Sequence, residues 1–291
     1  MRTTRLILAV VLATIGTAPA VAQAPKVWTP QELFLRNVGT REQQDKQFTP
    51  HKIIGNVYSV GTETLGSFLI TTPDGLILIN TSYERTVPVI RDSVEKIGFK
   101  FTDIKIILGS HAHGDHMEGD ALAKQLTGAQ VMAMAEDVPA LQAMRPGGKE
   151  HPIDRILHDG DQVTLGGTTL VAHLTPGHTK GCTTWTMKVQ DGGRSYDVVV
   201  IGSMGVNPGT RLVNNPNNPT IAEEYVRGFK AMHQIPCDVP LGSHPAMYNM
   251  TDKLATARAG GPNPFIDPQG YKAEVDLVER TFTSVLNEQK P

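Results

Sequence analysis

The sequence predicts an α/β protein in which two β-sheets pack against each other and helices cover both outer faces. Short apolar segments rich in β-branched residues alternate with turn residues, and stretches with helical periodicity follow groups of these segments. The order of strands and then helix occurs twice along the chain. A doubly wound single sheet shares many of these features, and it stays open as an alternative at this point.

In the first half of the chain, strands are expected where apolar segments lie between turn residues: residues 52–60, 66–72, 75–80, 103–110 and 129–135. Pro73, Asp74 and Gly75 are typical of a hairpin turn. Helices are expected where apolar residues recur on one face, at 84–99 and 118–128. Gly128 is placed to end the second of these helices.

The second half repeats this arrangement. Strands are expected at residues 161–174, 182–190, 196–202 and 238–243. A helix is expected at 221–234, and a long helical stretch begins at about Gly270. No short internal repeat and no low-complexity linker interrupts the pattern, so residues 51–291 are expected to form one domain.

The N-terminus resembles a secretory signal peptide over residues 1–22. Arg2 and Arg5 form a basic start, residues 6–15 an apolar centre, and residues 20–22 (Ala-Val-Ala) a small-residue cleavage site. An uncleaved membrane anchor is the alternative, but the apolar stretch is short for a bilayer core of about 30 Å. We therefore expect an exported protein with no membrane anchor after cleavage, and a loose N-terminal extension at residues 23–50.

The charge balance argues against nucleic acid as a partner. The whole chain has 27 basic and 29 acidic residues, and removal of the two signal-peptide arginines leaves 25 against 29, a formal charge of −4. No basic cluster or stripe occurs. A small molecule is the expected partner, and a monomer is the default oligomeric state.

The strongest candidate for a metal-binding motif is "ILGSHAHGDHMEG" at residues 107–119. It places His111, His113, Asp115 and His116 directly after an expected strand. Imidazole and carboxylate are ligands that zinc prefers, and Gly114 permits a tight turn between them. A lone histidine is usually an ordinary surface or core residue, but that explanation is weak for the whole cluster.

A catalytic zinc needs about three protein ligands and an open position, so two ions need more ligands than this cluster offers. His178, in "HLTPGHTKGC", and His244, in "PLGSHPAM", also follow the ends of expected strands. Strand-end loops of two packed sheets can meet at one edge, where function is often found. Of the other histidines, His173 is expected to pack, His51 and His233 to lie on the surface, and His151 and His158 to flank a loop that could approach the site.

These motifs, H-x-H-x-D-H followed by P-G-H and G-S-H, resemble the metallo-β-lactamase superfamily, and more narrowly subclass B3 of the metallo-β-lactamases. The resemblance covers nearly all of the chain after the signal peptide. It implies a four-layer αββα sandwich and two zinc ions per chain. It also implies the ligands: His111, His113 and His178 for the first ion, and Asp115, His116 and His244 for the second.

The resemblance further implies the reaction: hydrolysis of the amide bond of a β-lactam ring (penicillins, cephalosporins or carbapenems) by a metal-activated hydroxide, which would give antibiotic resistance in a bacterial periplasm. Asp115 would be both a ligand and a catalytic hydrogen-bond partner of the hydroxide. Ser203 and Asn207 are candidate substrate contacts, with ordinary turn residues as the alternative.

Two other functions remain open. One is a lactonase or another ester hydrolase of the same superfamily. Relatives of that kind carry a metal-bridging Asp where this chain has Ser203, which argues against this alternative. The second is a non-catalytic exported zinc-binding protein. The chain also departs from the subclass at Tyr271, which replaces the expected disulfide partner of Cys237, and at Thr210, where relatives often have a tyrosine near the substrate.

Overall fold

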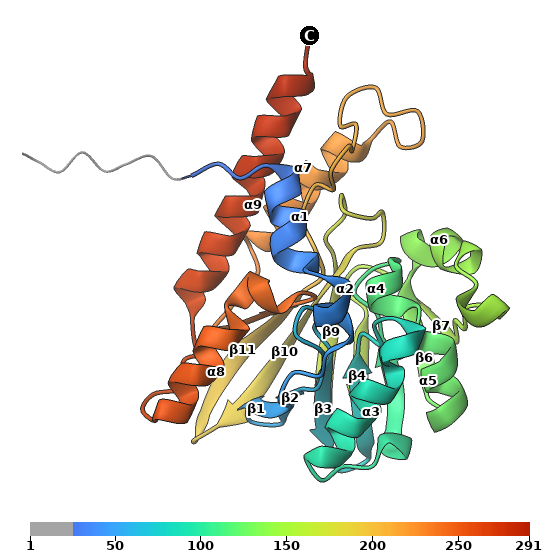
Figure 1. The fold of residues 1–291 in the computed structure, drawn as a ribbon, viewed down its shortest axis with the longest axis vertical. Coiled ribbons are helices and arrows are strands. Elements are labelled where there is room, and N and C mark those ends of the chain that lie inside the picture. Colours follow the sequence, from blue (N-terminus) through green and yellow to red (C-terminus); the bar gives the residue numbers. More distant parts are fainter. Residues whose placement is uncertain (1–25) are drawn as a thin grey trace, which may run out of the picture.

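The computed structural model describes residues 26–291. The stretch assigned to a signal peptide, residues 1–22, lies outside the described residues. Two β-sheets face each other in the middle of the molecule, and helices cover their outer faces (Figure 1). The expected αββα sandwich is therefore confirmed, and the alternative of one doubly wound sheet is excluded.

The first sheet is mixed and has seven strands in the order β1-β2-β3-β4-β5-β6-β7. The strands β1 to β4 pair antiparallel, and β4 to β7 pair parallel. Their bounds are β1 His51–Ile54, β2 Val57–Ser59, β3 Phe68–Thr72, β4 Gly75–Ile79, β5 Ile104–Leu108, β6 Gln130–Met134 and β7 Arg155–Leu157. The β3–β4 hairpin turns at Pro73 and Asp74, as expected.

The second sheet has five strands in the order β12-β11-β10-β9-β8. Only β11 and β12 pair parallel; the other neighbours are antiparallel. The bounds are β8 Gln162–Leu165, β9 Thr168–Leu174, β10 Thr183–Asp191, β11 Arg194–Ile201 and β12 Val239–Gly242.

Two segments expected as single strands are each divided by a hairpin. Residues 52–60 turn at Gly55, whose φ is +50°, and residues 161–174 turn at Gly166 and Gly167, with φ of +50° and +81°. Positive φ at one or both central residues is the geometry of tight hairpin turns and favours glycine. β7 was not among the expected strands, because it is short and only Leu157 of its three residues is buried.

The helices are α1 Pro30–Val38, α2 Arg41–Asp45, α3 Val87–Lys96, α4 Gly114–Met117, α5 Asp120–Thr127, α6 Val138–Ala143, α7 Ile221–Met232, α8 Met250–Ala259 and α9 Pro268–Gln289. Short 3₁₀ turns are η1 Glu84–Thr86, η2 Phe101–Asp103, η3 Ala135–Asp137, η4 Pro146–Gly148 and η5 Pro245–Tyr248. α6 and α8 were not expected. α6 has only six residues, and α8 lacks a clear apolar face.

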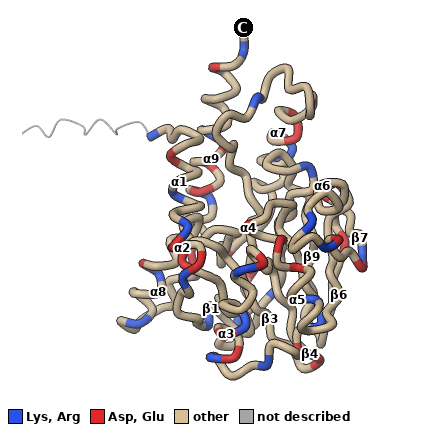
Figure 2. Tube along the Cα trace, turned by 45° about the vertical axis from the view of Figure 1, so that its right-hand side comes forward, with Lys and Arg blue, Asp and Glu red and all other residues tan. Residues whose placement is uncertain are grey.

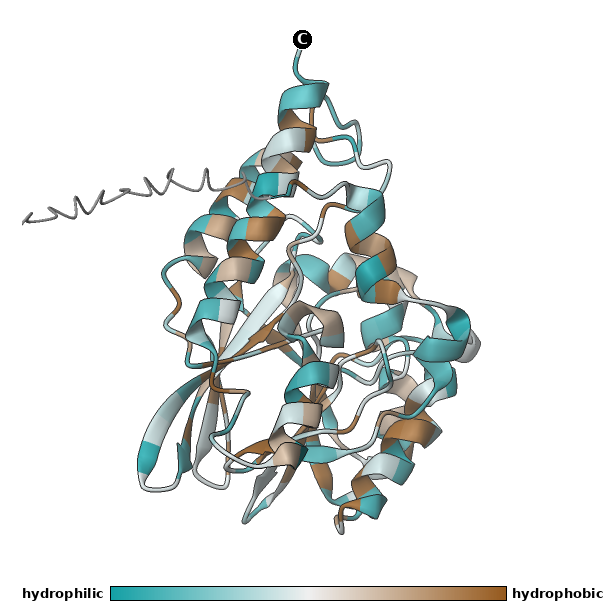
Figure 3. Ribbon diagram, turned by 60° about the vertical axis from the view of Figure 1, so that its left-hand side comes forward, coloured by the Kyte–Doolittle hydropathy of each residue, from teal (hydrophilic) through white to brown (hydrophobic). Residues whose placement is uncertain are grey.

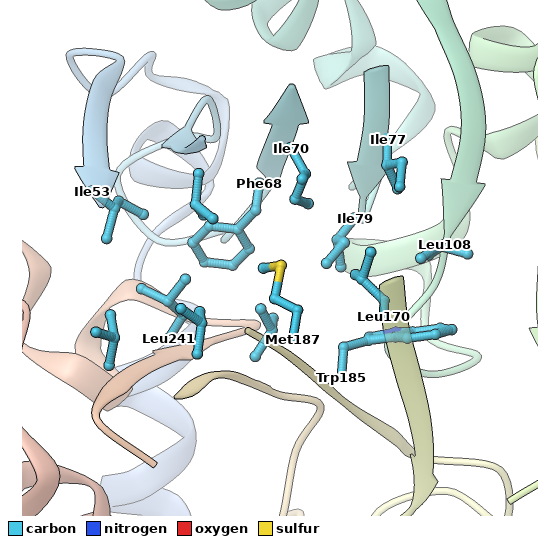
Figure 4. Close-up of a cluster of buried hydrophobic side chains, with 14 of the residues drawn as sticks. Ile53, Phe68, Ile70, Ile77, Ile79, Leu108, Leu170, Trp185, Met187 and Leu241 are labelled. Carbon is cyan, nitrogen blue, oxygen red and sulfur yellow. The ribbon is translucent and has the colours of Figure 1, made fainter. Parts of the chain in front are cut away.

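The main core lies between the two sheets. Phe68 and Ile77 of the first sheet face Trp185, Met187 and Leu241 of the second (Figure 4). All five side chains are nearly or fully buried. Burial of a large apolar side chain contributes about 1.5–3 kcal/mol, so this layer is the main attachment between the sheets.

The outer faces of the sheets have their own apolar clusters. α3 and α5 cover the first sheet through residues such as Ile90, Val94 and Ala123. α1, α7 and α9 cover the second sheet through residues such as Phe229 and Phe282. The helices carry hydrophobic and hydrophilic residues on different sides (Figure 3).

The N-terminal segment differs from the expected loose extension, because it forms α1 and α2. Both helices begin with a capping box, in which Thr29 pairs with Glu32 and Thr40 with Gln43. Acidic and basic residues are interspersed along the trace (Figure 2). In the described part of the chain, no helix has the length and apolarity needed to cross a lipid bilayer.

Candidate metal centre

The six expected ligands meet at one edge of the sandwich and come from both sheets. Four of them follow β5: His111 and His113 lie in the loop, and Asp115 and His116 in the short helix α4. His178 lies in the loop between β9 and β10, and His244 is the second residue after β12. Strands that end at a common edge thus bring together residues far apart in sequence.

The first group consists of His111, His113 and His178. One ring nitrogen from each lies within 4.8 Å of the others. The ring centroids are 4.7–4.8 Å apart, and the rings meet nearly edge to face. Three imidazoles converging on one point form a ligand set suited to zinc, with room for a further ligand.

The second group consists of Asp115, His116 and His244, again with one ligand atom each within 4.8 Å. Oδ2 of Asp115 lies 3.2 Å from Nε2 of His116 and 3.7 Å from Nε2 of His244. The two groups adjoin, since the ring centroids of His111 and His116 are 4.2 Å apart. The side chains therefore form two neighbouring ligand sets.

Hydrogen bonds outside the site fix the tautomers of two ligands. Nδ1 of His178 donates to the carbonyl oxygen of Gly205 at 2.6 Å, and Nδ1 of His244 donates to that of Thr64 at 2.9 Å. A carbonyl can only accept, so Nδ1 carries the proton in each ring. Nε2 of each histidine then has a free lone pair, which is the form that binds a metal.

The pKa values favour the same protonation states. Burial lowers the pKa of His178 to about 3, with His113 adding to the effect, and burial with His116 lowers the pKa of His244 to about 4. Burial acts to raise the pKa of Asp115, but His116 and His244 outweigh it and hold that pKa well below its ordinary value. Neutral imidazoles and an ionised carboxylate are what metal binding requires.

The site residues fit zinc on a further observation. Nε2 of His111 and Nε2 of His116 are buried, and neither has a hydrogen-bond partner within residues 26–291. A buried polar atom without a partner costs about 1–3 kcal/mol. A metal ion coordinated by these nitrogens would remove that cost.

The family model of the metallo-β-lactamase superfamily matches residues 67–244, from the start of β3 to the last of the six ligands. This match covers more than half of the chain. The chain belongs to the metallo-β-lactamase superfamily. Members of the superfamily bind zinc, and the two ligand groups are the candidate zinc-binding residues here.

Solved structures of subclass B3 enzymes are similar over nearly their whole length. The native FEZ-1 metallo-β-lactamase from Legionella gormanii is 46% identical, with a TM-score of 0.82; the match covers 84% of this chain and 98% of that one. BJP-1, a subclass B3 metallo-β-lactamase of Bradyrhizobium japonicum, is 38% identical with a TM-score of 0.79, covering 85% and 97%. The expected likeness to subclass B3 is confirmed.

Curated relatives match over a shorter stretch. A hydroxyacylglutathione hydrolase from Pseudomonas syringae is 36% identical over 95 residues, which is 32% of this chain and 31% of that protein. The chain thus aligns with about a third of the length of the curated relatives it matches. These relatives support a metal-dependent hydrolase within the superfamily.

Asp137, at the end of η3, is a supporting residue that the sequence did not reveal. Its Oδ2 accepts the backbone N–H of Ala112 and the hydroxyl of Thr179, both at 2.8 Å, and its Oδ1 accepts the N–H of Gly181 at 2.7 Å. One buried carboxylate thereby joins the loop of His111 and His113 to the loop of His178. The acidic pair Glu136 and Asp137 just after an expected strand was the available sign.

The cleft beside the ligands is small, about 70 Å³, and α1 forms one of its walls. Ser203 and Asn207 both line it, as expected of substrate contacts, and contact with substrate stays a prediction. The lining residues are Leu33, Phe34, Asn37, Val38, His113, Asp115, His178, Ser203, Gly205, Val206, Asn207 and His244. A larger groove of about 750 Å³ lies on the outer face of the second sheet and contains none of the ligands.

The remaining histidines lie outside the two groups. His151 is buried behind α4, with Nε2 3.0 Å from the carbonyl oxygen of Met117 and 3.2 Å from Asp120, so it anchors its loop without entering the cleft. His158 is exposed; His233 is exposed and pairs with Glu279, as expected for a surface residue. His173 donates to or accepts from Thr186, which confirms its packing role. The prediction for His51 was wrong, because its half-buried ring stacks on Phe265.

Both cysteines are free. Cys237 is half-buried and lies in the same apolar cluster as Tyr271, the residue in place of its expected disulfide partner. Tyr271 instead donates a 2.7 Å hydrogen bond to the carbonyl oxygen of Met232. A hydrogen bond and apolar contacts thus join α7 to α9 where the subclass often has a disulfide.

Proposed function

We propose that this protein is a zinc-dependent β-lactamase that holds two zinc ions and hydrolyses the amide bond of the β-lactam ring in penicillins, cephalosporins and carbapenems. The observation that carries the proposal is the likeness to the FEZ-1 enzyme over nearly the whole of that enzyme, at 46% identity. The similarity to hydroxyacylglutathione hydrolases covers only about a third of their length.

The ligand chemistry supports the same function. Ser203 lines the cleft with a neutral hydroxyl, at a position where ester and thioester hydrolases of the superfamily have a metal-bridging Asp. His116 supplies a ligand for the second group instead, so both groups have three protein ligands without a bridging carboxylate. This ligand set is what the subclass B3 resemblance implies.

Zinc ions held by these residues would polarise the scissile carbonyl and activate a water molecule near neutral pH. The protein's part is to orient the reactants. The ionised carboxylate of Asp115 can accept a hydrogen bond from the attacking water and aim its lone pair at the carbonyl carbon. Ser203 and Asn207 would donate hydrogen bonds to polar groups of the substrate, and the narrow cleft limits competing water.

The biological setting forms part of the proposal. Export by the N-terminal signal would place the mature protein in a bacterial periplasm, where β-lactams act, and hydrolysis there would confer resistance. We propose that the mature protein works as a monomer. N-terminal sequencing of protein from the periplasmic fraction and sedimentation analysis test these two points.

The deciding experiment measures hydrolysis of a chromogenic cephalosporin and a carbapenem by the mature protein, with and without a chelator. Loss of turnover with the chelator and recovery with zinc are expected. No turnover by folded, zinc-loaded protein would reject the proposal. The second candidate, favoured by the match to hydroxyacylglutathione hydrolases, is then tested with glutathione thioesters and lactones.

A further inference from the structure

Helix α1 presents four residues to the cleft: Leu33, Phe34, Asn37 and Val38. Leu33 is 2% exposed and packs in the cluster with α7 and α9, whereas Phe34 is 39% exposed. The apolar ring of Phe34 and the amide of Asn37 therefore stand beside the metal ligands. Any molecule that enters the cleft meets this helix.

α1 depends on tertiary contacts for its position. It has nine residues, and helices of that length are marginal in isolation. The chain breaks away directly after it at Gly39, where φ is +61° and a side chain would lie 2.7 Å from atoms of Gln43 and Thr64. The chain therefore turns sharply between α1 and α2.

An ion pair with the C-terminal helix provides a directional attachment. The guanidinium of Arg36 reaches both carboxylate oxygens of Glu274 on α9, with Nη1 to Oε2 at 2.9 Å. The side chains are only 18% and 8% exposed. A bidentate, largely buried ion pair of this kind restricts how α1 can lie against α9, because the planar guanidinium matches the carboxylate in one orientation. Figure 1 shows α1 lying beside α9.

The same guanidinium orients a residue of the cleft. Nε of Arg36 donates to Oδ1 of Asn37 at 2.9 Å. The amide oxygen of Asn37 thus accepts from Arg36, and Nδ2 of Asn37 makes no hydrogen bond within residues 26–291. The amide N–H groups of Asn37 therefore have no protein acceptor, and Asn37 lines both the cleft and the adjoining hollow beside Arg36 and Thr64.

We propose, on the basis of the proposed hydrolysis at the metal centre, that Arg36 and Glu274 are positioning residues for substrate binding. They hold α1 so that Asn37 donates to a carbonyl or carboxylate oxygen of the substrate and Phe34 contacts an apolar substituent of it. Arg36 bonds to Glu274 and Asn37 and to no member of either ligand group, so the expected effect of the pair is on the affinity for substrate.

The first test separates KM from kcat. Arg36→Lys keeps the positive charge but loses the bidentate contact with Glu274 and the hydrogen bond to Asn37. It should raise KM about tenfold and leave kcat within about threefold, with zinc content unchanged. Asn37→Ala should raise KM in the same way. The double variant R36M/E274L replaces the pair by apolar side chains, which keeps stability near that of the wild type but should still raise KM.

The second test needs no substrate. Hydrogen exchange of the α1 amides, followed by mass spectrometry, should be faster in Arg36→Lys than in the wild type. Lys188→Met is the matched control, because it removes an exposed ion pair with Asp197 on the second sheet, away from the ligands. That control should change neither exchange in α1 nor KM.

The outcomes distinguish this proposal from the proposed function. Lactam hydrolysis by the wild type, with KM and α1 exchange unaltered in Arg36→Lys, would overturn the role of the pair and leave the β-lactamase proposal in place. If the wild type hydrolyses a thioester or lactone instead, the KM comparison is made with that substrate. A raised KM there, with faster α1 exchange, would support the role of the pair while the β-lactamase proposal fails.

Discussion

The carboxylate of Asp137 accepts the backbone N–H of Ala112 at 2.8 Å, and Ala112 lies between two histidines of the first ligand group. The same carboxylate accepts the N–H of Gly181 in the loop of the third histidine. Burial raises the pKa of Asp137, and these hydrogen bonds partly offset that effect. One side chain therefore sets the distance between the loops that make the first group.

Asp137→Asn should weaken zinc binding at His111, His113 and His178. An amide NH₂ would face a backbone N–H that needs an acceptor, at a cost of about 1–3 kcal/mol. Zinc content by atomic absorption and stability by urea unfolding measure the effect. Thr179→Val is the matched control: it removes one of the three hydrogen bonds and should cost less. Equal zinc content in the wild type and Asp137→Asn would contradict the prediction.

Asp115→Ala should lower turnover by orders of magnitude and weaken metal binding at the second group, because in the proposed function Asp115 is a metal ligand and the hydrogen-bond partner of the attacking water. Steady-state kinetics and metal titration provide the measurement. Glu118→Gln changes a neighbouring carboxylate outside both groups and should behave like the wild type. Near-normal turnover by Asp115→Ala with two zinc ions still bound would refute the role given to Asp115.

Ser203→Asp tests the choice of ligand set. The change adds a carboxylate to the cleft lining, where ester hydrolases of the superfamily have one. Lactam hydrolysis should not improve, and Ser203→Ala serves as the control for loss of the hydroxyl. A gain in lactam turnover by Ser203→Asp, measured as kcat/KM, would mean that the second ligand group differs from Asp115, His116 and His244.

Removal of metal should lower thermal stability as well as activity. Each ion would join loops of both sheets, and a ligand present at 100 times its Kd stabilises the folded state by about 2.7 kcal/mol. Calorimetry with chelator, and again after addition of zinc, should show a lowered and then restored Tm. A Tm that does not respond to either addition would show that the ligands are held by the fold alone.

Asp267 should make the free energy of unfolding depend on pH in the acidic range. It caps α9 by accepting the N–H of Gly270 at 2.8 Å, and it lies 2.8 Å from Nζ of Lys253. Burial acts to raise its pKa, but Lys253 and Gly270 outweigh this and hold the pKa below 3.8. The stabilisation is therefore present at neutral pH and is lost as the pH falls through the lowered pKa.

Asp267→Ala should accordingly lose about 2 kcal/mol of unfolding free energy at pH 7, with a smaller difference near pH 3. Asp267→Asn is the control, because it keeps the cap and loses the ion pair. Denaturant unfolding at both pH values provides the comparison. An equal loss at pH 7 and at pH 3 would contradict the ionised form as the stabilising one.

The sequence predicted which residues would gather at one edge of the sandwich, because strand ends can be recognised from local sequence. His111, His178 and His244 each follow an apolar strand, and a motif of fixed spacing identifies their neighbours. The hairpins at Gly55 and Gly166 were missed although glycines marked both, because the apolar residues on each side continue without a break.

The role of α1 could not be predicted from local sequence. Arg36 of this helix pairs with Glu274, which lies near the other end of the chain. The role of Asp137 also could not be predicted from local sequence. Its partner Ala112 lies in a loop of the first sheet, and its partner Gly181 lies in a loop of the second. Contacts of this kind depend on how the sheets pack, which a pattern of apolar residues does not specify.

The division of each ligand group between the two sheets also sets an order of events during biosynthesis. The segment up to His116 offers an incomplete set for either ion, and His244 emerges from the ribosome only near the end of synthesis. The first ligand group is complete once His178 has been synthesised, whereas the second needs His244. The two ligand groups are therefore completed at different stages of synthesis, and the group that contains Asp115 and His116 is completed last.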